Sequence, residues 1–286
     1  MRNPDTLILG AVAYDAKVVT IWDGFAAYFQ ANGLAFDYIL YSNYERQVEG
    51  HFAKQYDVAW NSPLAWLQAS AFATKLGLKA EAVAMRDTDR DLTSVIITRR
   101  DCPVQSLADL RGKTIGVGAA DSPQATLIPL LHLAESGLEP GRDFEVRRFD
   151  VLLGKHGDHV GGERDAVKAL LAGEVDACCM IDSNHLAFSK EGTIPVGATR
   201  ILAQTATYDH CNFTVLESAP RPLIDEFLRL LFAMSYQDPK VRPLLDLEGL
   251  KAWLPGRIEK YAPLERAINR FGTIAPFMAM LNQKFM

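Results

Sequence analysis

The first sixty residues alternate between short β-rich runs and amphipathic helical runs, and this alternation constrains the fold more than any other feature. It predicts strands over 7–14, 36–41 and 56–60, separated by helices over 22–30 and 43–53. Strands joined through helices in this order pair in parallel, and ligands of open α/β sheets bind outside the carboxyl ends of the strands. The sequence therefore predicts an α/β protein with a ligand site where these strands end.

Polar side chains stand at two of these strand ends. Tyr14 closes the first strand, and Asn61 and Ser62 follow the third, directly before a helix predicted over 64–72. Asn61 and Ser62 either donate hydrogen bonds to a ligand or cap their own helix, and both roles stay open. All three residues are candidates for ligand binding.

A second strand-to-helix turn follows the β-rich run 114–117. Ser122 is a good N-cap residue, and Pro123 suits the first helical position. If Ser122 caps the helix, the backbone N–H groups of Gln124, Ala125 and Thr126 lack intrahelical partners, and the helix dipole makes this end positive. The turn is then either a seat for a small anion or an ordinary capped turn.

The β-α pattern restarts near residue 100, which predicts a second lobe. We expect lobe 1 to comprise 1–98 and 206–286 and lobe 2 to comprise 99–205, because a late strand over 213–216 returns to the first lobe. The chain would cross between lobes near 97–101 and near 202–208. Two crossovers form a hinge, so we expect two mixed, mostly parallel sheets with a cleft between the lobes.

Charge and composition exclude several classes of protein. The chain has 49% hydrophobic and 23% charged residues, which is typical of a globular protein, and its net charge of -5 gives no basic footprint for nucleic acid. No apolar run is long enough to cross a membrane, and the N-terminus lacks the pattern of a secretory leader. Four cysteines without a CxxC pair and six scattered histidines predict neither a metal site nor a cofactor, with thiols reduced and mostly buried.

Four segments together resemble the phosphonate/phosphate-type solute-binding proteins of ABC transporters, which have the type II periplasmic-binding fold. These segments are SNYERQVEGHFAKQYDVAW (42–60), SLADLRGKTIGVG (106–118), DSPQATLIP (121–129) and DAVKALLAGEVDACCMIDSNHLAF (165–188). The resemblance implies two lobes that close on a small anion, with helix N-termini and hydroxyls receiving its oxygens.

The resemblance also assigns site residues. Tyr44 matches the tyrosine that reaches the ligand, Asn61 and Ser62 match the loop after the DxAW strand, and the anion cradle falls on Ser122, Gln124 and Ala125. Three positions depart from the family pattern, since Pro123 replaces a threonine, Gln124 has an amide in place of a second hydroxyl, and Glu163 lies where the family commonly has a histidine. A carboxylate there would repel a phosphonate unless it turns away or holds a cationic group, so the ligand could be zwitterionic.

Further polar residues leave alternatives open. His159, with its loop neighbours Lys155 and His156, either supplies positive charge to the site or belongs to a solvated loop. Asp182 either contacts the far end of the ligand or caps the helix expected from Asn184. His210 either lines the cleft or serves only the hinge.

We therefore expect a solute-binding protein that captures a small anionic or zwitterionic metabolite for ABC-type uptake, as a monomer or weak dimer, possibly with an ABC permease as partner. The alternative is a cytosolic enzyme or ligand sensor on the same fold, comparable to desulfinases, decarboxylases or pyrimidine synthases. Catalysis would need a histidine beside a thiol such as Cys178, Cys179 or Cys211, and the sequence indicates such a pair only weakly. The resemblance implies a periplasmic location, whereas the missing leader implies a cytoplasmic one if the sequence is complete.

Overall fold

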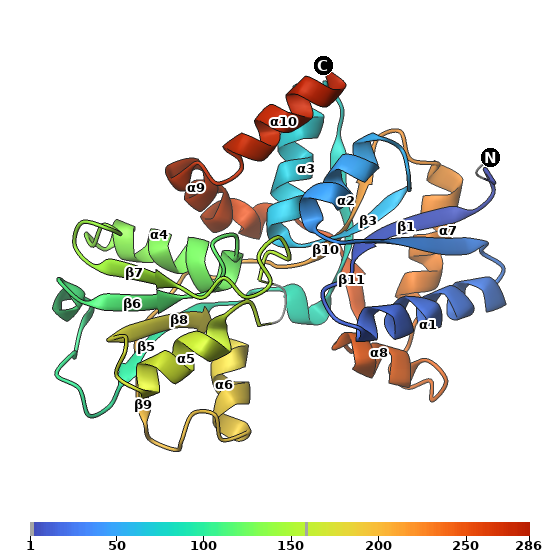
Figure 1. The fold of residues 1–286 in the computed structure, drawn as a ribbon. Helices are drawn as coiled ribbons and strands as arrows, with labels where there is room; N and C mark the ends of the chain where they lie inside the picture. Colours follow the sequence, from blue (N-terminus) through green and yellow to red (C-terminus); the bar gives the residue numbers. More distant parts are fainter. Residues whose placement is uncertain (1–2, 158–159) are drawn as a thin grey trace. The chain divides into compact units, whose positions relative to one another are not determined.

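The computed structural model describes residues 3–157 and 160–286, and the chain divides into two compact units. Unit 1 comprises Met1–Arg90, Asp209–Glu259 and Ile274–Met286, and unit 2 comprises Asp91–Tyr208 and Lys260–Thr273. Each unit contains one β-sheet with helices packed on both faces (Figure 1). The α/β class with two mixed sheets is thereby confirmed.

The sheet of unit 1 has six strands in the order β11-β4-β10-β3-β1-β2. The predicted parallel pairing holds where β1 lies between β2 and β3, whereas β10 and β11 pair antiparallel with their neighbours. The late strand β10 returns to this sheet, as the sequence predicted. The strands are β1 (Leu7–Val12), β2 (Phe36–Tyr41), β3 (Val58–Asn61), β4 (Ala80–Arg86), β10 (Asn212–Leu216) and β11 (Trp253–Pro255).

Six helices enclose this sheet in two layers. One core cluster joins the sheet to α1 (Lys17–Ala31), α7 (Arg221–Phe232) and α8 (Arg242–Glu248). A second cluster joins α2 (Tyr44–Phe52), α3 (Pro63–Lys75) and α10 (Ala275–Phe285) to the sheet residue Val12. The first core is rich in aromatic side chains, with Phe213 packed edge-on to Phe227, because alternate strand residues and helix residues four apart both point inward.

The sheet of unit 2 has five strands in the order β7-β6-β8-β5-β9, and it is parallel around β6 and antiparallel around β5. Neighbouring residues of β8 serve opposite faces: Cys178 packs against the α5 side and Cys179 against the α4 side, as predicted for a strand. The strands are β5 (Ser94–Arg99), β6 (Thr114–Val117), β7 (Glu145–Arg148), β8 (Ala177–Ile181) and β9 (Thr199–Gln204). The helices are α4 (Ile128–Glu135), α5 (Glu163–Leu171), α6 (Asp182–Lys190) and α9 (Ala262–Phe271).

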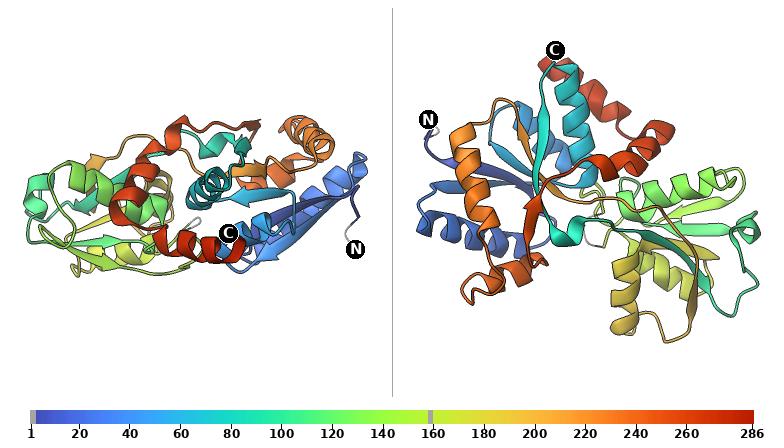
Figure 2. Two further views of the ribbon diagram at one scale, coloured as in Figure 1. Left: turned by 90° about the horizontal axis from the view of Figure 1, so that it is seen from above. Right: turned by 180° about the vertical axis from the view of Figure 1, so that it is seen from behind.

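The division into units differs from the predicted lobes. Strand β5 belongs wholly to unit 2, so the chain leaves unit 1 after Arg90 rather than near residue 98. The C-terminal region also divides, because α9 packs on α4 of unit 2 whereas α10 packs on α3 of unit 1 (Figures 1 and 2). An ion pair of 3.1 Å between Arg266 and Glu135 holds α9 in place. The chain therefore passes between units four times, not twice.

Most predicted elements are present, and those that were missed are short or lack a clear pattern. The expected strands at 36–41 and 114–117 have the observed bounds. The three-residue strand β11 and the helix α10 were not predicted. The described residues also form four short helical segments: the 3₁₀ helices η1 (Asp87–Asp89), η2 (Leu107–Leu110) and η4 (Glu259–Tyr261), and the π-helical turn η3 (Pro123–Leu127). Among the described residues, no helix is both long and apolar enough to span a bilayer.

Candidate functional site

Polar residues gather at one edge of the unit 2 sheet, which we call the unit 2 polar edge. Strands β6, β8 and β9 end there at Val117, Ile181 and Gln204. Because β5 is antiparallel to β8 and β9, its first residue Ser94 pairs with Ile181 at the same edge. The side chains that form this edge belong to Thr93, Ser94, Ser122, Gln124, Thr126, Glu163, Asp182, Asn184, Gln204 and Tyr208.

Ser94 connects three segments at this edge. Its hydroxyl donates to the Gln124 carbonyl oxygen at 2.5 Å and lies 2.7 Å from the Tyr208 hydroxyl. Its backbone N–H donates to the Thr205 hydroxyl at 2.9 Å. Since a hydroxyl has one proton, the Ser94 proton goes to Gln124 and the Tyr208 proton to Ser94. The turn η3 is thus tied to the start of β5.

The Ser122 turn is capped as predicted, but its amides are not free. The Ser122 hydroxyl accepts from Ala125 N at 3.2 Å, and the Ser122 carbonyl accepts from Thr126 N at 3.2 Å and from Leu127 N at 2.9 Å. The prediction that Ala125 and Thr126 present unpaired N–H groups is therefore wrong. The reason is the π-helical turn, in which one carbonyl serves the amides four and five residues later.

The segments 150–157 and 160–162 also cover this turn. The Gln124 side-chain amide donates to the Gly157 carbonyl oxygen, and Ala119 N donates to the Gly161 carbonyl oxygen at 2.9 Å. Gly157 has a φ of +65°, and a Cβ atom there would lie 2.3 Å from the Ser122 hydroxyl. The candidates Ser122, Gln124, Ala125 and Thr126 are consequently all buried. The predicted His159 lies outside the described residues.

Thr126 differs from its neighbours in the turn. Its side chain is 1% exposed, and its Oγ1 atom has no hydrogen-bond partner among the described residues. A buried hydroxyl without a partner costs about 1–3 kcal/mol, so proteins seldom keep one without a use for it. Among the described residues, Thr126 therefore contributes an unpaired side-chain hydroxyl to this turn.

Glu163 is the other unsatisfied group of the polar edge. It is the first residue of α5, it is fully buried, and Asn184 Nδ2 donates to its Oε2, while Oε1 has no partner. Burial raises the pKa of the Glu163 carboxyl to about 8, against the opposing effect of the Asn184 hydrogen bond. The dipole of α5 opposes burial too, but it contributes about 0.3–1 kcal/mol, which is less than one pKa unit of about 1.4 kcal/mol. Burial therefore dominates.

Asp182 lies beside this pair but does not cap a helix. Helix α6 begins at Asp182 itself, and no side chain caps it. The Asp182 carboxylate instead accepts from the Thr93 hydroxyl at 2.7 Å, and the Gln204 side-chain amide donates to that hydroxyl at 2.7 Å. The capping alternative is wrong, and a ligand contact for Asp182 stays a prediction.

The corresponding edge of the unit 1 sheet, which we call the unit 1 polar edge, holds Asn61 and Ser62. Asn61 Oδ1 accepts from Gln47 Nε2 at 2.8 Å, and Asn61 Nδ2 donates to Thr214 Oγ1 at 2.8 Å. The Ser62 hydroxyl accepts from Ala65 N at 3.1 Å, so it caps α3. Both side chains therefore make hydrogen bonds that stabilise unit 1 itself.

The two predicted tyrosines also belong to unit 1. Tyr44 opens α2 and is 1% exposed, because its ring packs into the core cluster with Val12 and Val48. Tyr14 is partly buried against the other cluster, and the Lys17 ammonium lies 5.8 Å from its ring centroid. Both rings contribute to packing, and their contact with a ligand stays a prediction.

His210 lies in a charged network at the unit 1 polar edge. Arg86 holds the Asp89 carboxylate through Nε–Oδ2 at 2.6 Å and Nη2–Oδ1 at 2.9 Å, and it contacts Glu248 at 3.2 Å. Arg86 next to Asp89 holds the pKa of that carboxyl well below its usual value, although burial acts in the opposite direction. His210 Nδ1 is 3.6 Å from Asp89 Oδ1 and 3.1 Å from the Cys211 sulfur.

This network resembles neither a metal site nor a catalytic relay. Asp89, His210 and Cys211 bring ligand atoms within 4.8 Å of one another, but both Asp89 oxygens are held by Arg86, which a divalent cation would have to displace. A relay needs the two ring nitrogens of a histidine to face different partners. Here the same nitrogen faces both the acid and the thiol.

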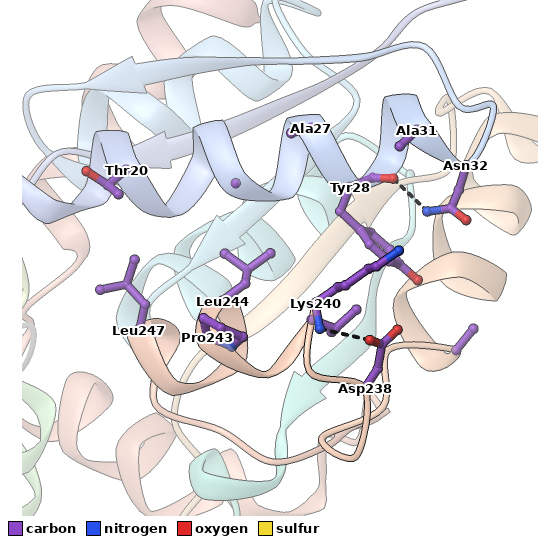
Figure 3. A pocket seen from close by; sticks show the side chains of 13 residues that line it. Thr20, Ala27, Tyr28, Ala31, Asn32, Asp238, Lys240, Pro243, Leu244 and Leu247 are labelled. Atoms are coloured by element: carbon purple, nitrogen blue, oxygen red, sulfur yellow. Dashed lines mark hydrogen bonds between the residues drawn. The ribbon is translucent and has the colours of Figure 1, made fainter.

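A groove in unit 1 lies apart from these residues. It lies between α1 and the segment 238–247, it measures about 850 Å³, and its lining is mainly aliphatic (Figure 3). Its polar groups serve the local backbone: Asn32 Nδ2 donates to the Tyr28 carbonyl oxygen at 2.8 Å, and the Asp238 carboxylate accepts from Lys240 N at 2.8 Å. The groove contains none of the residues predicted to bind the ligand.

Comparison with known proteins assigns the family. The model of the family described as "ABC transporter, phosphonate, periplasmic substrate-binding protein" matches residues 11–261. The chain belongs to this family. Its members are the substrate-binding components of ABC transporters, and the predicted resemblance is confirmed.

The individual proteins compared below have low sequence identity to this chain. The chain is 31% identical over 178 residues to the tetrathionate sensor histidine kinase TtrS of Salmonella typhimurium; the match covers 60% of the chain but only 28% of that protein. The structure of PhnD1 from Prochlorococcus marinus in complex with methylphosphonate superposes with a TM-score of 0.69 at 17% identity, covering 94% of this chain and 99% of that one. XAC2383 from Xanthomonas citri bound to ATP gives 0.67 at 16% identity, covering 99% and 100%. Both structures support the type II periplasmic-binding fold.

Several residues of the unit 2 polar edge were not predicted from the sequence. Thr93, Ser94 and Asn184 were missed, as was Tyr208. The rule of carboxyl strand ends overlooks Thr93 and Ser94, because an antiparallel strand brings its amino end to the same edge. The polar pair before the strand 94–99 was the available signal.

Proposed function

We propose that this member of the phosphonate-binding family captures a small ligand with a tetrahedral phosphorus or sulfur oxyanion. The family match over residues 11–261 carries this proposal. The names of the relatives support the chemical class, since methylphosphonate, tetrathionate and ATP all carry such oxyanion groups.

We place the anion at the unit 2 polar edge. Thr126 supplies a buried hydroxyl that has no partner in the described structure, and Glu163 supplies a carboxyl with one unpaired oxygen. Buried polar groups of this kind are satisfied when a ligand brings the missing partner. A contribution from unit 1, through Tyr14, Tyr44, Asn61, Ser62 or His210, and closure of a hinge on the ligand stay predictions.

We propose delivery to an ABC permease as the role of this binding, in keeping with the family. A sensor role is the second candidate, because the TtrS match places similar sequence within a sensor kinase. The two roles can be separated genetically. Loss of uptake of a labelled oxyanion on deletion of the coding sequence indicates transport, whereas loss of a transcriptional response with uptake unchanged indicates sensing.

The test of binding is calorimetric titration with methylphosphonate, methanesulfonate, tetrathionate and sulfate, using wild type and Thr126→Val. Valine has the shape of threonine without its hydroxyl, so we expect affinity to fall about 10- to 100-fold, equivalent to about 1–3 kcal/mol. Unfolding by urea should show a stability that is unchanged or higher, because an unsatisfied buried hydroxyl is removed.

The matched control is Thr74→Val. Thr74 lies exposed on α3, where its hydroxyl donates to the Ser70 carbonyl oxygen at 2.9 Å, and we expect its affinity to equal that of wild type. Equal affinity of Thr126→Val and wild type would remove Thr126 from the site. Failure of all four anions to bind wild type would contradict the proposed function itself.

A further inference from the structure

The charge state of Glu163 determines which oxyanion the site can accept. An ionised carboxylate next to a bound anion would repel it, so the acid must turn away, pair with a cation or carry a proton. The structure distinguishes these cases. Glu163 is fully buried, so it does not turn away to solvent.

Glu163 is also not held in an ion pair. Across residues 3–157 and 160–286, no lysine, arginine or histidine nitrogen lies within 4.0 Å of its carboxyl, and the groups acting on it are the Asn184 amide and the backbone at Ile181. The next residue, Arg164, pairs with Glu191 and stacks on the Phe188 ring at 4.4 Å. The Arg164 guanidinium therefore does not neutralise Glu163.

Among the described residues, the titratable groups on the strands that pack against α5 do not compensate the charge of Glu163. Helix α5 packs on β5, β6 and β8. Strand β8 contributes the Cys178 and Cys179 thiols, whose pKa values burial raises, and β6 has no titratable side chain. The only cation of β5, Arg99, bonds to the Leu170 carbonyl oxygen at the opposite end of α5.

Two further groups near the polar edge are acids. Burial raises the pKa of the Tyr208 phenol, and the carboxylates of Glu163 and Asp182 raise it further, which places both acids near that ring. Asp182 already accepts from Thr93. Neither of these groups supplies a positive charge that would stabilise an ionised Glu163.

The hydrogen bonds of Glu163 fit a protonated acid. Oε2 accepts from Asn184, as the carbonyl oxygen of a carboxylic acid does, and Oε1 is left without a partner. A hydroxyl at Oε1 is a donor that needs an acceptor, and each oxygen of an oxyanion is an acceptor. The missing partner of Oε1 and the chemistry of the proposed ligand are complementary.

We propose that Glu163 keeps its proton when the ligand is bound and donates through Oε1–H to one oxygen of the oxyanion. This inference rests on the proposed function, because it assigns the chemistry of the same site. It makes Glu163 a residue that determines specificity. The site then favours a fully ionised oxyanion whose oxygens are all acceptors, such as a sulfonate, over a zwitterion that places an ammonium group at this position.

A dependence on pH follows, with a sign that can be measured. Because burial raises the pKa of Glu163 to about 8, the carboxyl is neutral at pH 7 and ionises above pH 8. Ionisation removes the donor and adds repulsion, so affinity falls as pH rises through that value. If only the neutral form binds, the dissociation constant rises about tenfold between pH 7 and pH 9.

The experiment is titration of methanesulfonate into wild type, Glu163→Gln and Glu174→Gln at pH 6 to 9. Methanesulfonate keeps one charge throughout, so any slope belongs to the protein. We expect the tenfold loss in wild type and in Glu174→Gln, whose replaced acid pairs with Arg147 at a half-exposed site. Glu163→Gln keeps a donor and an acceptor in the same shape, so it should bind without a slope. A slope that persists in Glu163→Gln, or its absence from wild type, overturns the proposal.

A second measurement needs no ligand. The infrared difference spectrum of wild type minus Glu163→Gln at pH 6 should contain the carbonyl stretching band of a protonated carboxylic acid, and this band should disappear above pH 8. A spectrum without the band overturns the proposal and leaves the proposed function standing. A spectrum with the band, together with no binding of methanesulfonate, methylphosphonate, tetrathionate or sulfate, overturns the proposed function and with it the role of Glu163 in specificity.

Discussion

The two polar edges use different chemistry, although both lie where the strands of a mixed sheet end. At the unit 1 polar edge the charges are numerous and each is in an ion pair: Arg86 pairs with Asp89 and Glu248, and Arg257 holds both oxygens of Asp209 at 2.6 Å. At the unit 2 polar edge the contacts run mainly through hydroxyls and amides, and Thr126 and Glu163 each keep one unpaired atom. Gln47 Oε1 at the first edge also lacks a partner among the described residues. We infer that the ion pairs of the first edge stabilise its unit, and we propose the second edge as the ligand site.

The largest effect is expected from Arg86→Gln in unit 1. Removing one partner of a buried ion pair leaves the Asp89 and Glu248 carboxylates uncompensated, which costs about 3–5 kcal/mol of the free energy of unfolding. Urea unfolding measures this loss. Under conditions where the variant is folded, its affinity for methanesulfonate should change little. A loss of affinity of about tenfold or more in the folded variant would break the contrast between the two edges.

A smaller effect on the free energy of unfolding, which depends on pH, is expected from Glu163→Gln in unit 2. The folded protein holds the Glu163 proton up to about pH 8, whereas the unfolded chain releases it above about pH 4.5. Unfolding therefore releases a proton between about pH 4.5 and pH 8. The contribution of Glu163 to the free energy of unfolding consequently falls by up to about 1.4 kcal/mol per pH unit as pH rises. Between pH 5 and pH 7 this amounts to about 2–3 kcal/mol.

Denaturant titrations at several pH values test this linkage. We expect the difference in stability between Glu163→Gln and wild type to increase from pH 5 to pH 7 in favour of the variant. A constant difference would mean that the acid ionises normally in the folded protein.

The smallest effect is expected from Ser122→Ala. If Ser122 contacts the ligand, as the sequence alone predicts, Ser122→Ala weakens binding by about 1–3 kcal/mol without affecting the fold. In the structure Ser122 caps η3 and lies under Gly157, so we now expect a loss of about 1 kcal/mol in stability. Thermal unfolding and calorimetry compare the two outcomes. Full stability combined with weaker binding would restore Ser122 as a direct ligand contact.

The predictions from sequence succeeded where local pattern decides the outcome. Most strands and helices and the capping role of Ser122 follow from periodicity and capping preferences within a few residues. The family resemblance also held. Prediction failed at the lobe boundaries and at the division of the C-terminal helices, because these depend on which distant surfaces pack together.

The candidate site was predicted less well than the fold. The sequence located the turn at 122–126 and singled out Glu163, but it assigned the anion contacts to amides that the π-helical turn and Ser122 already occupy. It also missed Ser94 and Asn184, which reach the same edge from an antiparallel strand and from α6.

Taken by itself, the sequence determined the α/β class, the family and the residue types available at each strand end, because these depend on neighbours along the chain. Only the tertiary structure decided which polar groups are satisfied and which are not. Gly157 covers the Ser122 turn, Asn184 comes to Glu163 from 21 residues away, and no cation arrives with it among the described residues. Burial and hydrogen bonding set the charge of a carboxyl, and both are properties of its surroundings in space.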